Sequence, residues 1–178
     1  MRVLDIGGNN GKRSREAYPE ANITVLDLKT GFDVEKLPLP QGKWDIILVN
    51  HLIEHLGNTD EFIEKIKGII GDAVLELSTP NMAAWFNRVL FLFGYLPHTY
   101  EVSSHFNVAK PFEWGKERLG GHKRLFTPQA LKELLECYGF EVFYMGGERN
   151  TDYPINPFIK FLDWLFTKNV NLASSFRI

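Results

Sequence analysis

The chain has 178 residues, of which 24% are charged and 44% hydrophobic, and its formal net charge is -2. This length and composition support a folded core and exclude wholesale disorder. The near balance of acidic and basic residues excludes a strongly basic nucleic-acid-binding protein. Cys137 is the only cysteine, so an internal disulfide is excluded and a reducing compartment is favoured. We therefore expect one cytoplasmic domain over residues 1–178, with no nucleic-acid partner.

The first half of the sequence alternates short apolar runs with helical patterns. The apolar runs predict strands at residues 2–6, 23–28, 44–50 and 73–78, and helices are expected at residues 12–18 and 59–70. Asn58 and Glu61 offer a capping pair for the second helix, and Gly71 ends it. Because strands that alternate with helices form βαβ units, the pattern predicts an α/β fold with a parallel sheet.

The second half is less regular. Residues 83–93 form an almost wholly apolar helix, and residues 94–121 form a long loop that contains aromatic residues and histidines. A helix begins with Thr127 as its N-cap, runs to Tyr138 and packs Cys137. A strand is expected at residues 140–145 and an apolar helix at 158–166, and residues 172–178 are the one candidate for a last strand.

The sequence does not determine what two of the apolar helices pack against. The helix at residues 83–93 is interpreted as a core helix, because it is too short to span a membrane. The alternative is an apolar lid for a lipid-like acceptor or a contact with a membrane surface. The helix at residues 158–166 has the same alternatives, or forms a homodimer contact.

A glycine turn follows the first strand, and such turns hold anionic or nucleotide ligands at the start of a helix. The dinucleotide pattern fails, because Asn9 and Lys12 stand where glycines are required, and this disfavours an oxidoreductase. The remaining pattern combines Asp5, Gly7 and Gly11 with an acidic residue, Asp27, at the end of the next strand. The Asp27 carboxylate can accept both hydroxyls of a ribose, and Asp5 can order the loop or receive an ammonium group.

Five segments in order resemble the class I S-adenosylmethionine-dependent methyltransferases, in particular the type 11 subgroup. They are VLDIGGNNG at residues 3–11, VLD at 25–27, WDIILVNHLIEHL at 44–56, STPN at 78–81 and GHKRLFT at 121–127. The later segments are also similar to ubiquinone-biosynthesis O-methyltransferases and to methionine-biosynthesis-associated methyltransferase-like proteins. The resemblance covers residues 3–145. It implies a Rossmann-like three-layer sandwich with a mostly parallel sheet and S-adenosylmethionine as cofactor.

The resemblance also implies roles for individual residues. Backbone at Gly7, Gly8 and Asn9 would face the methionine end of the cofactor, Asp27 the ribose, and Asp33 with the Val34 amide the adenine edge. The implied cofactor-binding set is Asp5, Gly7, Gly8, Asn9, Gly11, Asp27, Leu28, Asp33, Val34 and Asn50. His51, just past a strand end, and His122 are the candidate catalytic residues.

The chain departs from the family pattern in three places. Asn9 replaces the central glycine of the loop, and asparagine tolerates positive φ better than most residues. Residues 28–32 are too few for the helix and third strand of many relatives, so the sheet is expected to be abbreviated at that edge and at its C-terminal strand. No helix precedes the first strand, which predicts a trimmed enzyme domain.

We expect direct in-line methyl transfer to a small-molecule acceptor, which can be apolar, with oxygen favoured over nitrogen and carbon. Residues 82–123 would form a substrate-side insertion or lid. The alternative is a non-catalytic methyltransferase-fold protein that binds or scaffolds a partner, suggested by Asn9 and the missing cover. His51 and His55 have the spacing of helical metal ligands, but no third ligand is obvious, so no metal is expected and His55 is interpreted as structural.

Overall fold

A computed structural model of the chain describes residues 1–97, 99–103, 105–106, 108–110, 121–149 and 157–178. Within these residues, six strands form one sheet in the order β2-β1-β3-β4-β6-β5. The strands are β1 (Arg2–Ile6), β2 (Asn22–Leu26), β3 (Ile46–Asn50), β4 (Val74–Pro80), β5 (Gly146–Glu148) and β6 (Ser175–Arg177). The first four run parallel, and β6 pairs antiparallel with both β4 and β5. The expected Rossmann-like, mostly parallel architecture is confirmed.

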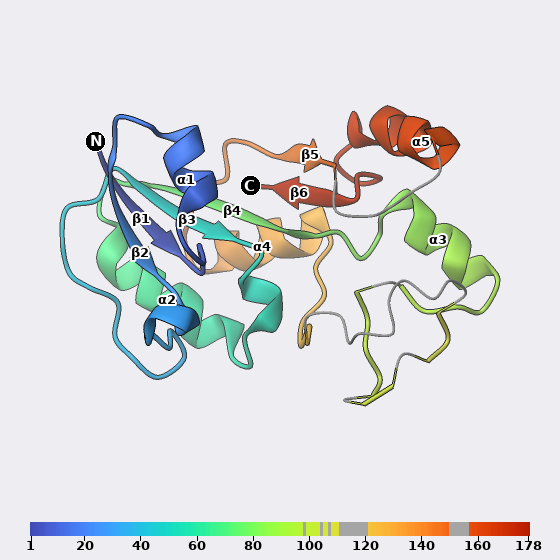
Figure 1. Cartoon of the computed structure of the whole chain (residues 1–178), viewed down its shortest axis with the longest axis horizontal. Coiled ribbons are helices and arrows are strands. Elements are labelled where there is room, and N and C mark those ends of the chain that lie inside the picture. Colours follow the sequence, from blue (N-terminus) through green and yellow to red (C-terminus); the bar gives the residue numbers. More distant parts are fainter. Residues whose placement is uncertain (98, 104, 107, 111–120, 150–156) are drawn as a thin grey trace.

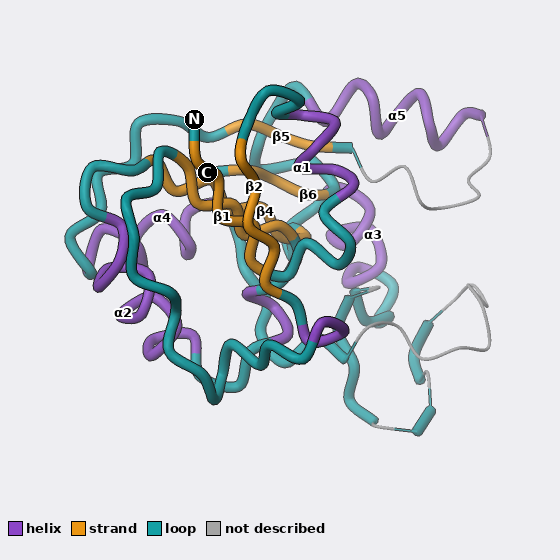
Figure 2. The backbone as a smooth tube through the Cα atoms, turned by 60° about the vertical axis from the view of Figure 1, so that its left-hand side comes forward, coloured by secondary structure: helices purple, strands orange, loops and turns teal. Residues whose placement is uncertain are grey.

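Helices cover both faces of the sheet. They are α1 (Lys12–Ala17), α2 (Thr59–Ile70), α3 (Trp85–Leu92), α4 (Pro128–Cys137) and α5 (Pro157–Thr167), with short 3-10 helices η1 (Leu28–Thr30) and η2 (Ile53–His55). Figure 1 shows α2 and α4 beneath the sheet and α1 above it. Both α3 and α5 lie at the end of the molecule where β4 ends (Figure 2), and the rings of Trp85 and Phe166 stack there with centroids 5.3 Å apart.

The main core lies between the sheet and the pair α2 and α4. Alternate residues of the strands point into it, because successive side chains of a strand lie on opposite faces. Its buried members include Leu4, Ile6, Ile47, Val49, Phe62, Ile63, Ile66, Leu131 and Leu135. The other strand positions face α1, so this alternation sends the Asp5 side chain away from the main core.

The capping signals in the sequence are used as predicted. The Asn58 side chain accepts a hydrogen bond from the Glu61 amide (3.2 Å), and Gly71 caps the other end of α2. The Thr127 hydroxyl accepts a hydrogen bond from the Ala130 amide (3.1 Å) and begins α4. Both caps satisfy backbone donors that a helix start leaves unpaired.

As expected, the sheet is abbreviated at both of its outer edges. β2 is its edge strand, and the residues after it form η1 instead of a further helix and strand. At the other end β5 and β6 have only 3 residues each. The candidate strand within residues 172–178 is therefore confirmed as β6.

Three expectations for the second half are wrong. Residues 140–145 form no strand, because their partner β6 is too short to pair with them, and Phe143 is 75% exposed. Cys137 is exposed, because it points away from the α4 face that carries Leu131 and Leu135. α3 is not a core helix: Asn87 is its one buried residue, and Leu92 is 82% exposed. No helix in the described part of the chain is long and apolar enough to cross a bilayer.

Candidate active site

The glycine turn between β1 and α1 has the backbone geometry that its sequence predicts. Gly7, Asn9 and Gly11 have φ angles of 79°, 55° and 70°, all in the left-handed region. Asparagine is among the few residues that enter this region readily, so the turn survives the loss of its central glycine. The Gly7 amide donates to the Leu26 carbonyl (2.7 Å) and so joins the turn to the end of β2.

Asp5 lies beneath this turn and shapes it. Its side chain is 2% exposed and accepts a hydrogen bond from the Ser14 hydroxyl (2.6 Å), which ties β1 to α1. A Cβ atom at Gly8 would lie 2.0 Å from Asp5 Oδ2, so only glycine fits there. Burial raises the pKa of Asp5. These contacts support the loop-ordering role of the two considered for Asp5.

Asp27 faces the same turn from the end of β2. Its Oδ2 accepts a hydrogen bond from the Asn9 amide (2.8 Å), and its Oδ1 accepts one from the Lys29 amide (2.8 Å). A carboxylate has about four acceptor positions, so Asp27 keeps lone pairs for a ligand. The neighbouring Leu28 is 71% exposed, which leaves an apolar surface beside the carboxylate.

Asp33 and Val34 follow in the next turn. The Asp33 carboxylate accepts a hydrogen bond from the Glu35 amide (3.0 Å) and pairs with Lys36 at 2.8 Å. The hydrogen bond from Lys36 lowers the pKa of Asp33. Val34 is buried, and its carbonyl accepts a hydrogen bond from Lys65 Nζ (2.9 Å). These contacts stabilise the turn itself, and the adenine-reading role stays a prediction.

Asn50 and His51 lie where β3 ends. Asn50 Oδ1 accepts a hydrogen bond from the Ser78 hydroxyl (2.9 Å), and the His51 amide donates to the Ser78 carbonyl (2.9 Å). His51 has a φ of 51°, an uncommon conformation for a residue other than glycine. Its side chain is about one-third exposed at the carboxyl edge of the sheet, where ligands bind in open α/β folds.

Glu54 is a site residue that sequence reasoning missed. It is 2% exposed, and its Oε2 accepts a hydrogen bond from the Thr79 hydroxyl (3.0 Å). Its Oε1 lies 3.4 Å from His51 Nδ1 and has no hydrogen-bond partner among the described residues. The available signal was an acidic residue within HLIEHL, a segment that otherwise contains apolar residues and histidines. Burying a carboxylate costs free energy unless it is paired or hydrogen-bonded, so an acidic residue here indicates a specific partner.

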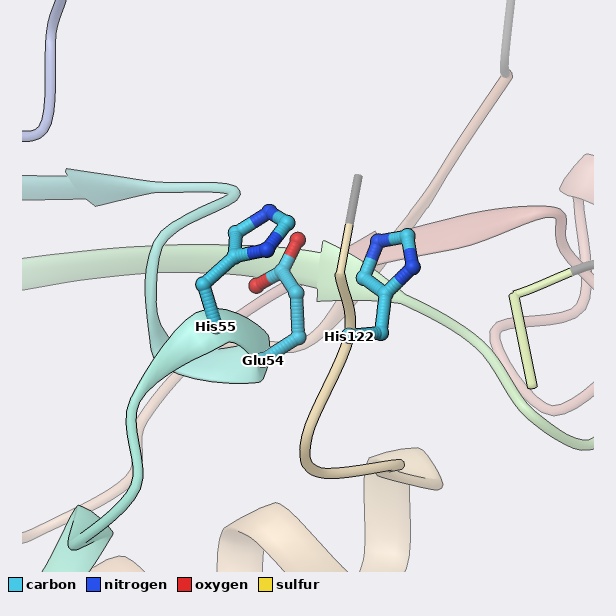
Figure 3. Close-up of side chains that lie close together, drawn as sticks. All are labelled: Glu54, His55 and His122. Carbon is cyan, nitrogen blue, oxygen red and sulfur yellow. The ribbon is translucent and has the colours of Figure 1, made fainter. Parts of the chain in front are cut away.

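His122 joins this group from a distant part of the sequence. Its ring stacks on that of His55 with centroids 4.7 Å apart, and Figure 3 shows Glu54 extending beside both rings. The Lys123 and Arg124 amides both donate to the Glu54 carbonyl (2.7 and 3.0 Å), which fixes the chain next to His122. Burial, and then the neighbouring His55, lower the pKa of His122, so the neutral imidazole is favoured.

The fold is that of solved S-adenosylmethionine-dependent methyltransferases. Solved structures with this fold include an S-adenosylmethionine-dependent methyltransferase from Mesorhizobium loti, with 14% identity and a TM-score of 0.57 over 99% of this chain and 88% of that one. Another is a possible histamine N-methyltransferase from Thermotoga maritima, with 13% identity and a TM-score of 0.54 over 99% of this chain and 79% of that one.

The sequence comparison identifies the family. A model described as a methyltransferase domain matches residues 1–144, and the chain therefore belongs to this methyltransferase-domain family. No curated protein matches the chain. The expected methyltransferase class is confirmed by this match, and the S-adenosylmethionine-dependent enzymes named above share its fold.

Proposed function

We propose that the chain methylates a small-molecule acceptor at the carboxyl edge of β1, β2 and β3. The observation that carries this proposal is the hydrogen bond from the Asn9 amide to Asp27 Oδ2 (2.8 Å). It holds the carboxylate at the end of β2 against the glycine turn at the end of β1. A nucleoside that carries an amino acid needs both features side by side, one for its ribose and one for its other end.

The described residues fit this cofactor. Gly7 and Gly8 let the turn pack closely on Leu52 and Asp5, whose side chains occupy the positions that Cβ atoms would take. Asp27 has lone pairs left for ribose hydroxyls, and a nucleobase over Leu28 would cover its exposed side chain. The full proposed set is Asp5, Gly7, Gly8, Asn9, Gly11, Asp27, Leu28, Asp33, Val34 and Asn50. Asp5 belongs to it as a positioning residue that acts through the turn.

The proposed chemistry needs little from the protein beyond position and one base. When bound, S-adenosylmethionine supplies a methyl group on a positively charged sulfur, and the carbon–sulfur bond breaks as the bond to the acceptor forms in line with it. An acceptor hydroxyl also releases its proton, and we assign His51 as the base that takes it. Glu54, 3.4 Å from His51 Nδ1, stabilises the imidazolium that results. His122 is the second candidate base.

The acceptor is proposed to be an oxygen nucleophile on a molecule with apolar parts. Exposed apolar side chains gather on and after α3, namely Val89, Phe91, Leu92 and Phe93. They belong to the proposed substrate-side segment at residues 82–123, part of which lies outside the described residues. Burying such side chains against an apolar acceptor would be favourable by about 25 cal/mol for each Å² covered.

The same surface supports a second proposal, that two copies of the chain associate through apolar helices. On α5, Phe161, Trp164 and Leu165 are each 43–54% exposed. α3 and α5 contact each other through Trp85 and Phe166, so their exposed residues can form one surface. A non-catalytic scaffold would also use such a surface, but the intact turn at Asn9 supports the enzyme.

Calorimetric titration with S-adenosylmethionine and its demethylated product tests the proposed function. We expect both to bind, and Asp27→Asn to weaken binding by at least about ten-fold, the value of one charge-assisted hydrogen bond. Asp45→Asn is the matched control, because Asp45 also accepts a backbone hydrogen bond (from Arg2, 2.6 Å) but precedes β3 at the opposite edge of the sheet. Equal losses in both variants, or no binding to the unchanged chain, would refute the site.

A further inference from the structure

We propose that Glu54, His55 and His122 form a binding site for a divalent transition-metal ion. Each of the three residues offers one ligand atom, and these atoms all lie within 4.8 Å of one another. Glu54 and His55 are neighbours in η2, and His122 comes from the segment before α4 (Figure 3). The sequence led us to expect no metal, because the third ligand lies far away along the chain.

The donor set has the chemistry of a transition-metal site. Two imidazoles and one carboxylate suit zinc, iron or manganese, and three protein ligands leave an open position for water or another molecule. A histidine binds a metal through the lone pair of its neutral form.

Two buried polar atoms in the cluster have no hydrogen-bond partner among the described residues, and a bound cation would interact with both. Glu54 Oε1 and His122 Nδ1 are inaccessible to solvent and have no hydrogen-bond partner among the described residues. An ionised carboxylate is costly to bury unless it is paired or ligates a metal. The Thr79 hydroxyl satisfies Oε2 only, and His51 stands 3.4 Å from Oε1 without forming a hydrogen bond.

The backbone holds the two contributing segments together independently of any ion. The Glu54 carbonyl accepts hydrogen bonds from the Lys123 and Arg124 amides (2.7 and 3.0 Å), next to His122. The Arg124 side chain also donates to the Gly57 carbonyl (2.5 Å). Ligand atoms on metal bonds of about 2.1 Å lie roughly 3.4 Å apart in a tetrahedron. Side-chain rotations that move the ligand atoms by about 1 Å would therefore complete the site.

A cation in this place would serve the acceptor side of the active site. η2 follows the end of β3, and Thr79, which contacts Glu54, lies at the end of β4. This role rests on the proposed function and changes one part of it, because a Glu54 carboxylate bound to the metal no longer serves as the counter-ion of His51. An acceptor oxygen at the open position of the metal would instead be polarised and would lose its proton more easily to His51. It would also favour an oxygen acceptor over a carbon acceptor.

Metal binding can be measured without methyl transfer. The purified chain is freed of metal with a chelator and titrated with Co²⁺ alone, while its visible absorption is recorded. We expect saturable absorption at a single equivalent, which Zn²⁺ then abolishes because Zn²⁺ binds such sites more tightly than Co²⁺. His122→Ala should weaken Co²⁺ binding by at least about ten-fold, the lower bound for loss of an outer-shell partner.

The matched control is His105→Ala, which removes an exposed histidine outside the cluster and should bind Co²⁺ like the unchanged chain. If His122→Ala does not fold, as judged by circular dichroism, Glu54→Gln provides the same test. The proposal is overturned if the unchanged chain gives no saturable absorption, or if the cluster variants bind as His105→Ala does. Titration of the same samples with S-adenosylmethionine separates this failure from failure of the proposed function.

Discussion

Gly8→Ala is the substitution that tests the turn most sharply. The added Cβ atom would lie 2.0 Å from Oδ2 and 2.2 Å from Cγ of Asp5, far inside van der Waals contact. The Asp5 side chain is buried and bonded to the Ser14 hydroxyl, so it can move only by breaking this hydrogen bond. Overpacking costs about 1–3 kcal/mol and a hydrogen bond to a charged group about 1.5–3 kcal/mol. We therefore expect the free energy of unfolding to fall by about 2.5–6 kcal/mol, the sum of these two costs.

Urea unfolding measures this loss, and calorimetric titration measures the accompanying loss of cofactor affinity. The control is Gly68→Ala in α2, where an added Cβ atom meets nothing within 4 Å. Alanine is the better helix former, so this control should stabilise the protein by up to about 1 kcal/mol. If Gly8→Ala has the same urea unfolding curve and the same cofactor affinity as the unchanged chain, Asp5 does not pack closely under the turn.

Three further substitutions test other parts of the structure. Thr127→Ala removes the α4 cap and should cost about 1 kcal/mol in urea unfolding. Leu92→Gln changes a residue that is 82% exposed, so it should change stability by less than about 0.5 kcal/mol but weaken dimerisation in analytical ultracentrifugation. Asp5→Asn should change how stability depends on pH: burial raises the pKa of Asp5 above 3.8, so the folded state holds its proton to higher pH than the unfolded state. Its contribution to stability is therefore greatest below 3.8 and is lost as pH rises through the raised value.

A specific result would contradict each of these three predictions. Gln129→Ala, an exposed neighbour on α4, is the control for the cap, and equal losses in the two variants would argue against it. An unchanged mass distribution for Leu92→Gln would exclude dimerisation through α3. For Asp5→Asn, unfolding is compared with the unchanged chain between about pH 4 and about pH 7, and a stability difference that does not vary with pH would contradict the raised pKa.

Local patterns in the sequence predicted most of the fold. The first four strands and α2 follow from apolar runs and from helical spacing, and Thr127 and Asn58 mark helix starts through their side chains. Asn9 could be recognised as a substitute for glycine because its tolerance of positive φ is an intrinsic property. These features depend on residues that are close in sequence, where propensity and periodicity act directly.

Features that depend on distant partners were not predictable in this way. Residues 140–145 have the aromatic and apolar composition of a strand, but a strand needs a partner, and β6 has only 3 residues, which pair with Gly146–Glu148 instead. The grouping of Glu54 with His122 depends on backbone hydrogen bonds between η2 and the segment before α4. The exposure of α3 could not be read from its composition either, because an apolar helix does not reveal whether a partner covers it.

The central claim is that the turn after β1 and the carboxylate after β2 hold one nucleoside cofactor between them. A crystal structure with S-adenosylhomocysteine, the demethylated product, tests it most directly. We predict density along Gly7 to Gly11, with ribose hydroxyls on Asp27 and the base over Leu28. Density at another edge of the sheet, or an Asp27 carboxylate with no contact to the ligand, would contradict this account.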